Sequence, residues 1–220
     1  MGGRHALMWS GGKDSVLALN RARARGIDVA RLVNFYDADT GRVRFHATRV
    51  AMLEAQAAEV GIELRAIPTS WSEMEARLTG ELDTLRADGF EGVVLGDIHL
   101  ADVRAWYEER VTGAGLSHVE PLWGEPPAGL LSEFVESGGR AVVTCVDLTR
   151  LQPDWLGRII DERFVADIRQ AAIDPCGENG EYHSFAFQGP PFRRPLQWQR
   201  GEVRSESHFS QLDLLPGRAE

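Results

Sequence analysis

The chain has 220 residues, of which 43% are hydrophobic and 26% charged, the composition of an ordinary soluble globular protein. Its formal net charge of −9 argues against a nucleic-acid partner held by general electrostatics. No apolar run approaches the length of a membrane span, and the first residues lack a signal-peptide core, so we expect a cytoplasmic protein with no membrane partner. Two cysteines, Cys145 and Cys176, make no disulfide framework.

Short apolar runs alternate with helical patterns along the first half of the chain. We expect strands at 6–9, 29–35, 64–67 and 92–95 and helices at 13–25, 50–60, 71–87 and about 103–111. This alternation predicts βαβ units and an α/β fold with a doubly wound parallel sheet. In such sheets the ligand binds beyond the carboxyl ends of the strands, where the strand order reverses.

The second half of the chain does not continue this regular alternation of strands and helices. Pro126-Pro127 is the best candidate boundary and divides the chain into domains 1–124 and 125–220. We expect an extended piece at 119–124, helices at 130–136 and about 154–171, strands at 141–146 and 182–187, and peripheral strands within 196–215. The smaller C-terminal domain is therefore predicted to be α+β.

The hexapeptide at 10–15, Ser-Gly-Gly-Lys-Asp-Ser, lies between the first predicted strand and the first predicted helix. Two glycines let backbone amides wrap around an anion, and the positive end of the helix dipole faces it. Ser10 and Ser15 can donate to phosphate oxygens, whereas the Asp14 carboxylate is reasonable there mainly if a divalent cation bridges it to phosphate. The bland alternative is a serine-glycine helix cap.

Lys13 is the only lysine among 24 basic residues, so this position favours a compact ammonium over a guanidinium fork. The hexapeptide is not a Walker A loop, because Leu7 stands where that pattern needs a glycine and Asp14 where it needs Ser or Thr. It resembles instead the pyrophosphate loop of the ATP pyrophosphatases. The resemblance implies a Rossmann-like, HUP-type sheet and cleavage of ATP between its α and β phosphates.

A second informative stretch runs from Asp174 to Phe185. Its glycines force tight turns, and Glu178, Glu181 and His183 could serve as acid–base groups or hold an amine. A metal site is the weaker reading, because this spacing matches no strong zinc pattern. A polar hairpin with solvated glutamates explains the residues equally well when they are taken alone.

Several motifs in the right order resemble the diphthine–ammonia ligase family. Besides 10–15, they are Phe45-His46, Gly96-Asp97-Ile98 with Arg104 and Glu108, Pro121 to Gly124, Trp155 to Arg158, Gly177 to His183, and Gly189 to Phe192. Gly96-Asp97-Ile98 departs from the Gly-Ala-Ile of the ligases proper and looks more like a divergent branch. From the residues alone, Arg104 and Glu108 are more simply a solvent-exposed helical ion pair.

The resemblance implies an ATP-dependent amidation, in which a substrate carboxylate is adenylated and ammonia displaces AMP. Residues 10–15 would hold the phosphates, with Lys13 and Asp14 catalytic and Asp14 on Mg²⁺. Gly96 and Asp97 would line the nucleotide crevice. The acceptor or ammonia would be bound by a set that shares polar or aromatic side chains: Arg104, Trp123, Arg158, Glu178, Glu181 and His183, of which Glu178, Glu181 and His183 are also catalytic candidates.

The partners implied are ammonia and a carboxylate on a small molecule or a protein. Elongation factor 2 is implied only if the source makes diphthamide, and a homodimer stays open. Two other functions use related folds. Sulfur transfer to tRNA would need Cys145 or Cys176 to be reactive, and a nucleotide sensor would bind ATP or AMP without turnover.

Overall fold

The computed structural model describes residues 3–217. Five parallel strands form the first sheet in the order β4-β2-β1-β5-β6, and a short antiparallel strand, β3, extends the edge of β2. Their bounds are β1 (Arg4–Met8), β2 (Asp28–Asp37), β3 (Arg42–Val43), β4 (Glu63–Thr69), β5 (Gly92–Val94) and β6 (Ser117–Val119). The strand order therefore reverses between β1 and β5.

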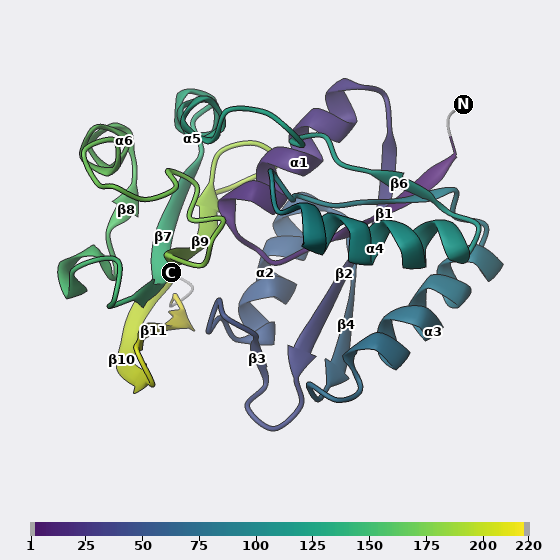
Figure 1. Cartoon of the computed structure of the whole chain (residues 1–220), viewed down its shortest axis with the longest axis horizontal. Coiled ribbons are helices and arrows are strands. Elements are labelled where there is room, and N and C mark those ends of the chain that lie inside the picture. Colours follow the sequence, from purple (N-terminus) through teal and green to yellow (C-terminus); the bar gives the residue numbers. More distant parts are fainter. Residues whose placement is uncertain (1–2, 218–220) are drawn as a thin grey trace.

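Helices cover both faces of this sheet (Figure 1). α1 (Lys13–Ala24) and α2 (Val50–Val60) contribute to one apolar core, and α3 (Met74–Ala87) and α4 (Ala101–Gly113) contribute to the other. Successive side chains of a strand point to opposite faces, and accordingly Leu7 lies in the first core and Ala6 in the second. The doubly wound parallel sheet predicted from the alternation of patterns is confirmed.

The second sheet is antiparallel and is built around β7 (Arg140–Asp147), which pairs with β8, β9 and β11. The remaining elements are α5 (Pro127–Glu136), the 3-10 turn η1 (Pro153–Trp155), β8 (Ile159–Ile160), α6 (Glu162–Ile168), β9 (Tyr182–Gln188), β10 (Trp198–Glu206) and β11 (Phe209–Pro216). All five strands come from the part of the chain after Pro126-Pro127.

Several expected element bounds are wrong. The helix expected at 154–171 is interrupted, because Gly157 has a left-handed φ of 77° and the β-branched pair Ile159-Ile160 adds to β7 as a strand. Asp161 then caps α6 by accepting the amide of Phe164. α3 begins at Met74 rather than at 71, which leaves Trp71 in an exposed turn.

Two further bounds differ around the proline pair. The extended piece ends at Val119, and 121–124 form a turn in which Gly124 donates its amide to Ile98. α5 begins at Pro127 rather than at 130, because proline suits the first turn of a helix.

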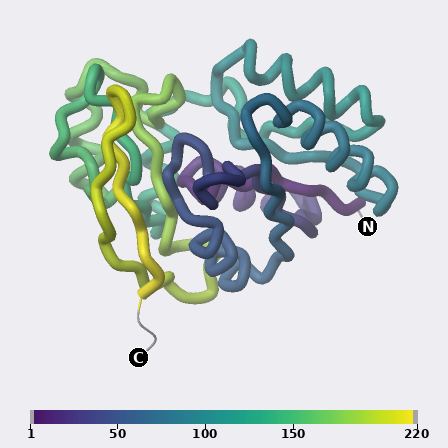
Figure 2. Tube along the Cα trace, turned by 90° about the horizontal axis from the view of Figure 1, so that it is seen from below, coloured from purple at the N-terminus to yellow at the C-terminus, as the bar shows by residue number. Residues whose placement is uncertain are grey.

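The two sheets share one apolar core that contains α1, α5 and β7 residues. In Figure 2 the yellow hairpin β10–β11 runs beside the dark-blue chain around β3 and α2. Arg49, which precedes α2, forms an ion pair of 2.6 Å with the buried Asp213 of β11. Within residues 3–217, no helix is long and apolar enough to cross a membrane.

Candidate functional site

The loop at 10–15 leaves β1 and enters α1 as predicted. Gly11 adopts a left-handed φ of 78°, and Gly12 donates its amide to the Ser10 hydroxyl at 3.2 Å. In the described part of the chain the amide of Ser15, in the first turn of α1, has no acceptor, and the amide of Asp14 faces only its own carboxylate. Such amides at the positive end of a helix dipole form an anion-binding site.

Lys13 is 3% exposed, and its ammonium lies 2.8 Å from a carboxylate oxygen of Asp14. The ammonium also donates to the carbonyl of Cys176 and lies 4.9 Å from the centre of the Tyr182 ring. Burial lowers the pKa of Lys13, but Asp14 and the neighbouring Tyr182 outweigh it and hold the pKa well above its ordinary value. Lys13 therefore supplies a positive charge that is held in place within the loop.

Gly96 brings the end of β5 against the start of α1. A Cβ placed on Gly96 would lie 3.3 Å from the backbone carbonyl of Asp14 and 3.4 Å from the amide of Ser15. A side chain at 96 would therefore press on the amides that face the anion site. This contact joins the two strands between which the sheet order reverses.

A cavity of about 230 Å³ opens beyond this contact. Of the residues predicted from sequence, it is lined by Ser10, Lys13, Asp14, Ser15, Gly96, Asp97, Glu178 and His183. The structure thus brings the pyrophosphate-type loop, the end of β5 and the stretch after Asp174 together. Gly11 and Gly12 lie in the loop itself, buried behind these residues.

Three carboxylates face this cavity, and burial raises the pKa of each. The pKa of Asp97 rises to about 6, through burial and the charge of Asp14. The pKa of Glu178 rises to about 7 for the same two reasons, although its carboxylate accepts the amide of Ile98 at 2.8 Å. Both groups therefore titrate close to neutral pH, which suits acid–base work.

Two histidines stand together at one side of the cavity, with ring centres 4.7 Å apart. Burial lowers the pKa of His46 to about 4. Burial, His46 and Lys13 together hold the pKa of His183 well below its ordinary value. Both imidazoles are therefore neutral at physiological pH.

Sequence reasoning missed the contacts that hold the loop against β9. Ser184 accepts the amide of Lys13 at 3.3 Å, and Ala186 donates its amide to the carbonyl of Gly11 at 2.9 Å. Gln56 of α2, which is fully buried, donates to both Gly11 and Ala186. The only signal for Gln56 is a polar side chain on the apolar face of a predicted helix.

Besides Gly11 and Gly12, four predicted site residues lie outside this cavity. Glu181 is 1% exposed and accepts the amides of Asp174 and Asn179, so it holds the loop that carries Glu178. Arg158 pairs with Asp167 at 2.5 Å and lies over the ring of Trp155.

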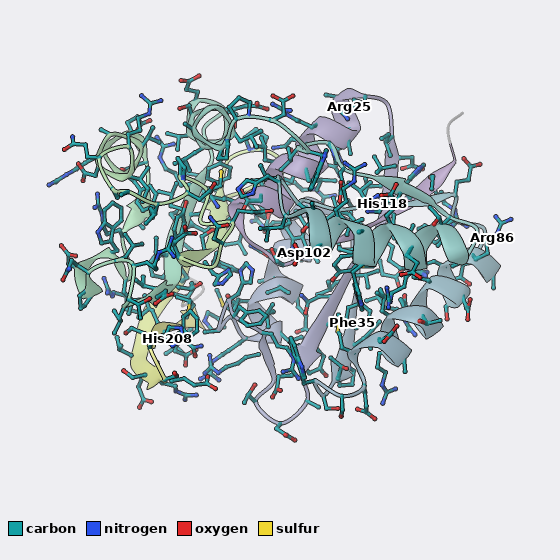
Figure 3. The ribbon with its side chains drawn as sticks, in the orientation of Figure 1. Arg25, Phe35, Arg86, Asp102, His118 and His208 are labelled. Atoms are coloured by element: carbon teal, nitrogen blue, oxygen red, sulfur yellow. The ribbon has the colours of Figure 1, made fainter. Side chains whose placement is uncertain are left out.

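The other two, Arg104 and Trp123, form a separate cluster. Arg104 lies 4.5 Å from the centre of the Trp123 ring and pairs with both Glu108 at 3.6 Å and Glu120 at 3.2 Å. Glu120, which sequence reasoning missed, is 2% exposed and sits 3.4 Å from His118, labelled on β6 in Figure 3. Burial and then Asp97 raise the pKa of Glu120 to about 7. The Arg104–Glu108 pair is thus part of a partly buried network.

The carboxylates at the cavity decide whether Mg²⁺ could be held there. Within residues 3–217, no three His, Cys, Asp or Glu side chains are grouped closely enough to hold a metal ion unaided. Asp14 is partly exposed and precedes Ser15, whose amide has no acceptor in the described chain. Because Mg²⁺ commonly takes one or two carboxylates and completes its shell with phosphates and water, Asp14 fits a shared ion of that kind.

Comparison with known proteins assigns both halves of the chain to one family. Residues 3–118 match the family model described as the diphthamide synthase N-terminal domain, and residues 126–213 match the diphthamide synthase C-terminal domain. The chain belongs to the diphthamide synthase family.

Relatives in this family carry the name diphthine–ammonia ligase. The protein from Danio rerio is 26% identical over an alignment of 236 positions, which covers 94% of this chain and 91% of that protein. The Homo sapiens protein is 24% identical over an alignment of 228 positions, which covers 91% of this chain and 84% of that protein. Among solved structures, the U34-tRNA thiolase NcsA from Methanococcus maripaludis with its 4Fe-4S cluster is similar over 60% of this chain and 55% of its own, with 16% identity and a TM-score of 0.38.

Proposed function

We propose that this protein is an ATP-dependent ligase that adenylates a substrate carboxylate and then amidates it with ammonia. The observation that carries the proposal is the loop at 10–15. Its buried Lys13 and the backbone amides of Asp14 and Ser15 at the start of α1 lie where the strand order of the sheet reverses. The names of the family relatives support the same class of reaction.

In the first step a carboxylate oxygen of the acceptor attacks the α phosphorus of ATP. The bond between that phosphorus and the oxygen bridging to the β phosphorus breaks, and pyrophosphate leaves with the bonding electrons. The loop amides, the hydroxyls of Ser10 and Ser15, and Lys13 would stabilise the charge that builds on pyrophosphate. Mg²⁺ held by Asp14 and the phosphates would supply further positive charge.

In the second step ammonia attacks the acyl carbon and AMP leaves, which yields the amide. One proton must be removed from nitrogen as this happens. Glu178, which lines the cavity and has a pKa of about 7, is suited to accept that proton. Asp97, with a pKa of about 6, lines the same cavity and adds negative charge that attracts ammonium.

Sulfur transfer is the rival reaction, and the cysteines do not favour it. Cys145 and Cys176 are 1% and 2% exposed. Burial raises the pKa of Cys145 to about 12 and raises that of Cys176 further still. A reactive thiolate needs the opposite shift. We expect Cys176→Ser to retain activity, and its inactivity in turnover with a normal fold would favour the sulfur chemistry.

Amidation is tested by adding ATP, Mg²⁺ and ¹⁵N-ammonium to fractions of a cell extract from the source organism. We expect one fraction in which AMP appears together with ¹⁵N in an acid-stable amide, in equal amounts. If AMP forms but no fraction incorporates ¹⁵N, the adenylation step would be supported and the amidation step would be contradicted. Tight ATP binding without turnover in every fraction would favour a nucleotide sensor.

A further inference from the structure

A second and larger cavity, of about 670 Å³, lies beside the loop site. Its walls are the chain from β2 to just past β3 (37–47), Trp71, and the β10–β11 hairpin, whose turn carries His208, labelled in Figure 3. His183 lines both cavities, so the two meet at its ring. A volume of this size suits a small ligand or one protein side chain with its neighbours.

Backbone strain gathers at this cavity. Among the residues described, three other than glycine have a left-handed φ: Phe45 at 62°, Ala47 at 56° and Ser207 at 55°. All three line the second cavity. Such backbone conformations are energetically unfavourable for residues other than glycine, and residues of this kind collect at ligand clamps.

Two large aromatic side chains at the cavity are left open to solvent. Phe45 is 57% exposed and Trp71 is 70% exposed. Their ring centres lie 6.4 Å apart in an edge-to-face arrangement, and Phe45 also stacks on His183 at 6.0 Å. Together the three rings form an aromatic path from the surface to the first cavity.

The charged side chains that line the cavity are three arginines, Arg42, Arg44 and Arg204, and two carboxylates, Asp37 and Glu206. Arg42 and Arg44 are occupied by Asp213 at 2.6 Å and Asp37 at 3.0 Å. The side chain of Arg204 is 52% exposed. Within residues 3–217 its only ion pair is a long contact of 3.9 Å with Glu202. Its guanidinium is therefore available to attract a carboxylate toward the cavity.

We propose that this second cavity is the acceptor site and that it takes a carboxylate attached to a flat apolar group. The flat group lies against Phe45 and Trp71, and the carboxylate points past His183 toward the loop at 10–15. This rests on the proposed function for the role of the ligand, but the binding itself does not depend on turnover. The carboxylate belongs either to a free small molecule or to a protein side chain.

The test uses 4-methylbenzoate as the free acid and a blocked pentapeptide with central 4-carboxyphenylalanine as the protein-like form. The fluorescence of Trp71 is obtained as the difference between the native protein and Trp71→Phe. We expect at least one of the two probes to quench it at millimolar concentration or below, and tighter binding of one form identifies the source. Phe45→Ala should weaken binding at least tenfold.

Val203→Ala is the matched control, because Val203 is 57% exposed on β10 but lies outside the cavity. It should bind the probe normally, and 4-methylbenzamide should bind at least tenfold more weakly than the acid. Absence of quenching by both probes, equal binding by Phe45→Ala, or equal binding of acid and amide would each overturn the proposal. Probe binding in a protein that cleaves ATP to ADP would keep this cavity as a carboxylate site and reject the proposed function.

Discussion

Gln56 and Gly11 are joined by a hydrogen bond of 2.9 Å from the side-chain amide of Gln56 to the backbone carbonyl of Gly11. The same amide donates to the carbonyl of Ala186 at 2.7 Å, and its oxygen accepts the indole N–H of Trp9 at 2.9 Å. One buried side chain therefore fixes the phosphate-type loop, its preceding strand and β9 relative to one another.

Replacing Gln56 should loosen this junction. Gln56→Ala leaves buried donors and acceptors unpaired at about 1–3 kcal/mol each, and we expect the free energy of unfolding to fall by about 2–4 kcal/mol in total. Gln56→Glu keeps the acceptor for Trp9 and loses the donor to Gly11, so it should raise the KM for ATP. Urea unfolding measures the first effect, with the exposed Gln199→Ala as control. An unchanged KM in Gln56→Glu would contradict the assigned role.

Lys13 should be irreplaceable by either alanine or arginine. Its ammonium is confined by Asp14 and the carbonyl of Cys176 at a site that is 3% exposed, so a guanidinium does not fit. We expect Lys13→Ala to lower the rate of pyrophosphate release by about 10²–10³-fold, as the loss of one oxyanion donor does. Lys13→Arg should rescue little of this. Near-normal release by either variant would remove Lys13 from the chemistry.

The rate of amide formation should depend on the ionisation of Glu178. With a pKa of about 7, Glu178 is protonated below neutral pH and unable to accept a proton, so the rate should rise as the pH increases through about 7. The profile is measured with free ammonia held constant at each pH. Glu178→Gln, whose amide oxygen can still accept the amide of Ile98, should abolish this rise of the rate with pH. The same rise in the variant would show that another group causes it.

Asp213 should couple stability to acid pH. Burial raises the pKa of Asp213, but Arg42 and Arg49 outweigh it and hold the pKa well below its ordinary value. A lowered pKa in the folded state stabilises the protein above the unfolded value of about 3.9, and this stability is lost as the pH falls below it.

We therefore expect Asp213→Asn to destabilise the protein by about 3–5 kcal/mol at pH 7, as breaking a buried ion pair does. Below pH 4 the difference between the variant and the native protein should shrink. Thermal or urea unfolding at both pH values measures this, with the exposed Asp83→Asn as control. A difference that stays constant down to pH 2 would show that charge is not the cause.

Local patterns were sufficient for the parallel sheet and for the loop at 10–15. Strand, glycines and helix follow one another there, and each is dictated by neighbours in the sequence. The helix expected at 154–171 failed for a non-local reason, because Ile159-Ile160 pairs with Ala141 and Val142 of β7. Tertiary pairing overrides the local pattern at such positions.

The candidate site was likewise predictable only where the local sequence determines the structure. Glu178 and Glu181 are close in sequence and of the same type, yet one lines the cavity and the other binds backbone amides. Which of them turns inward depends on the path of the loop after Asp174, which no local pattern specifies. Gln56, Ser184 and Glu120 act through contacts with other segments of the chain, and the sequence around them marks this only for Gln56, as a polar side chain on an apolar helix face.

The position at which ATP is cleaved tests the central claim most directly. The protein is incubated with ATP, Mg²⁺, ammonium and the active extract fraction, and the products are followed by ³¹P NMR, with Lys13→Ala as the matched control. The loop geometry predicts AMP and pyrophosphate in equal amounts from the native protein and almost none from the variant. ADP and inorganic phosphate would contradict the account, because the loop would then hold the phosphates for a different transfer.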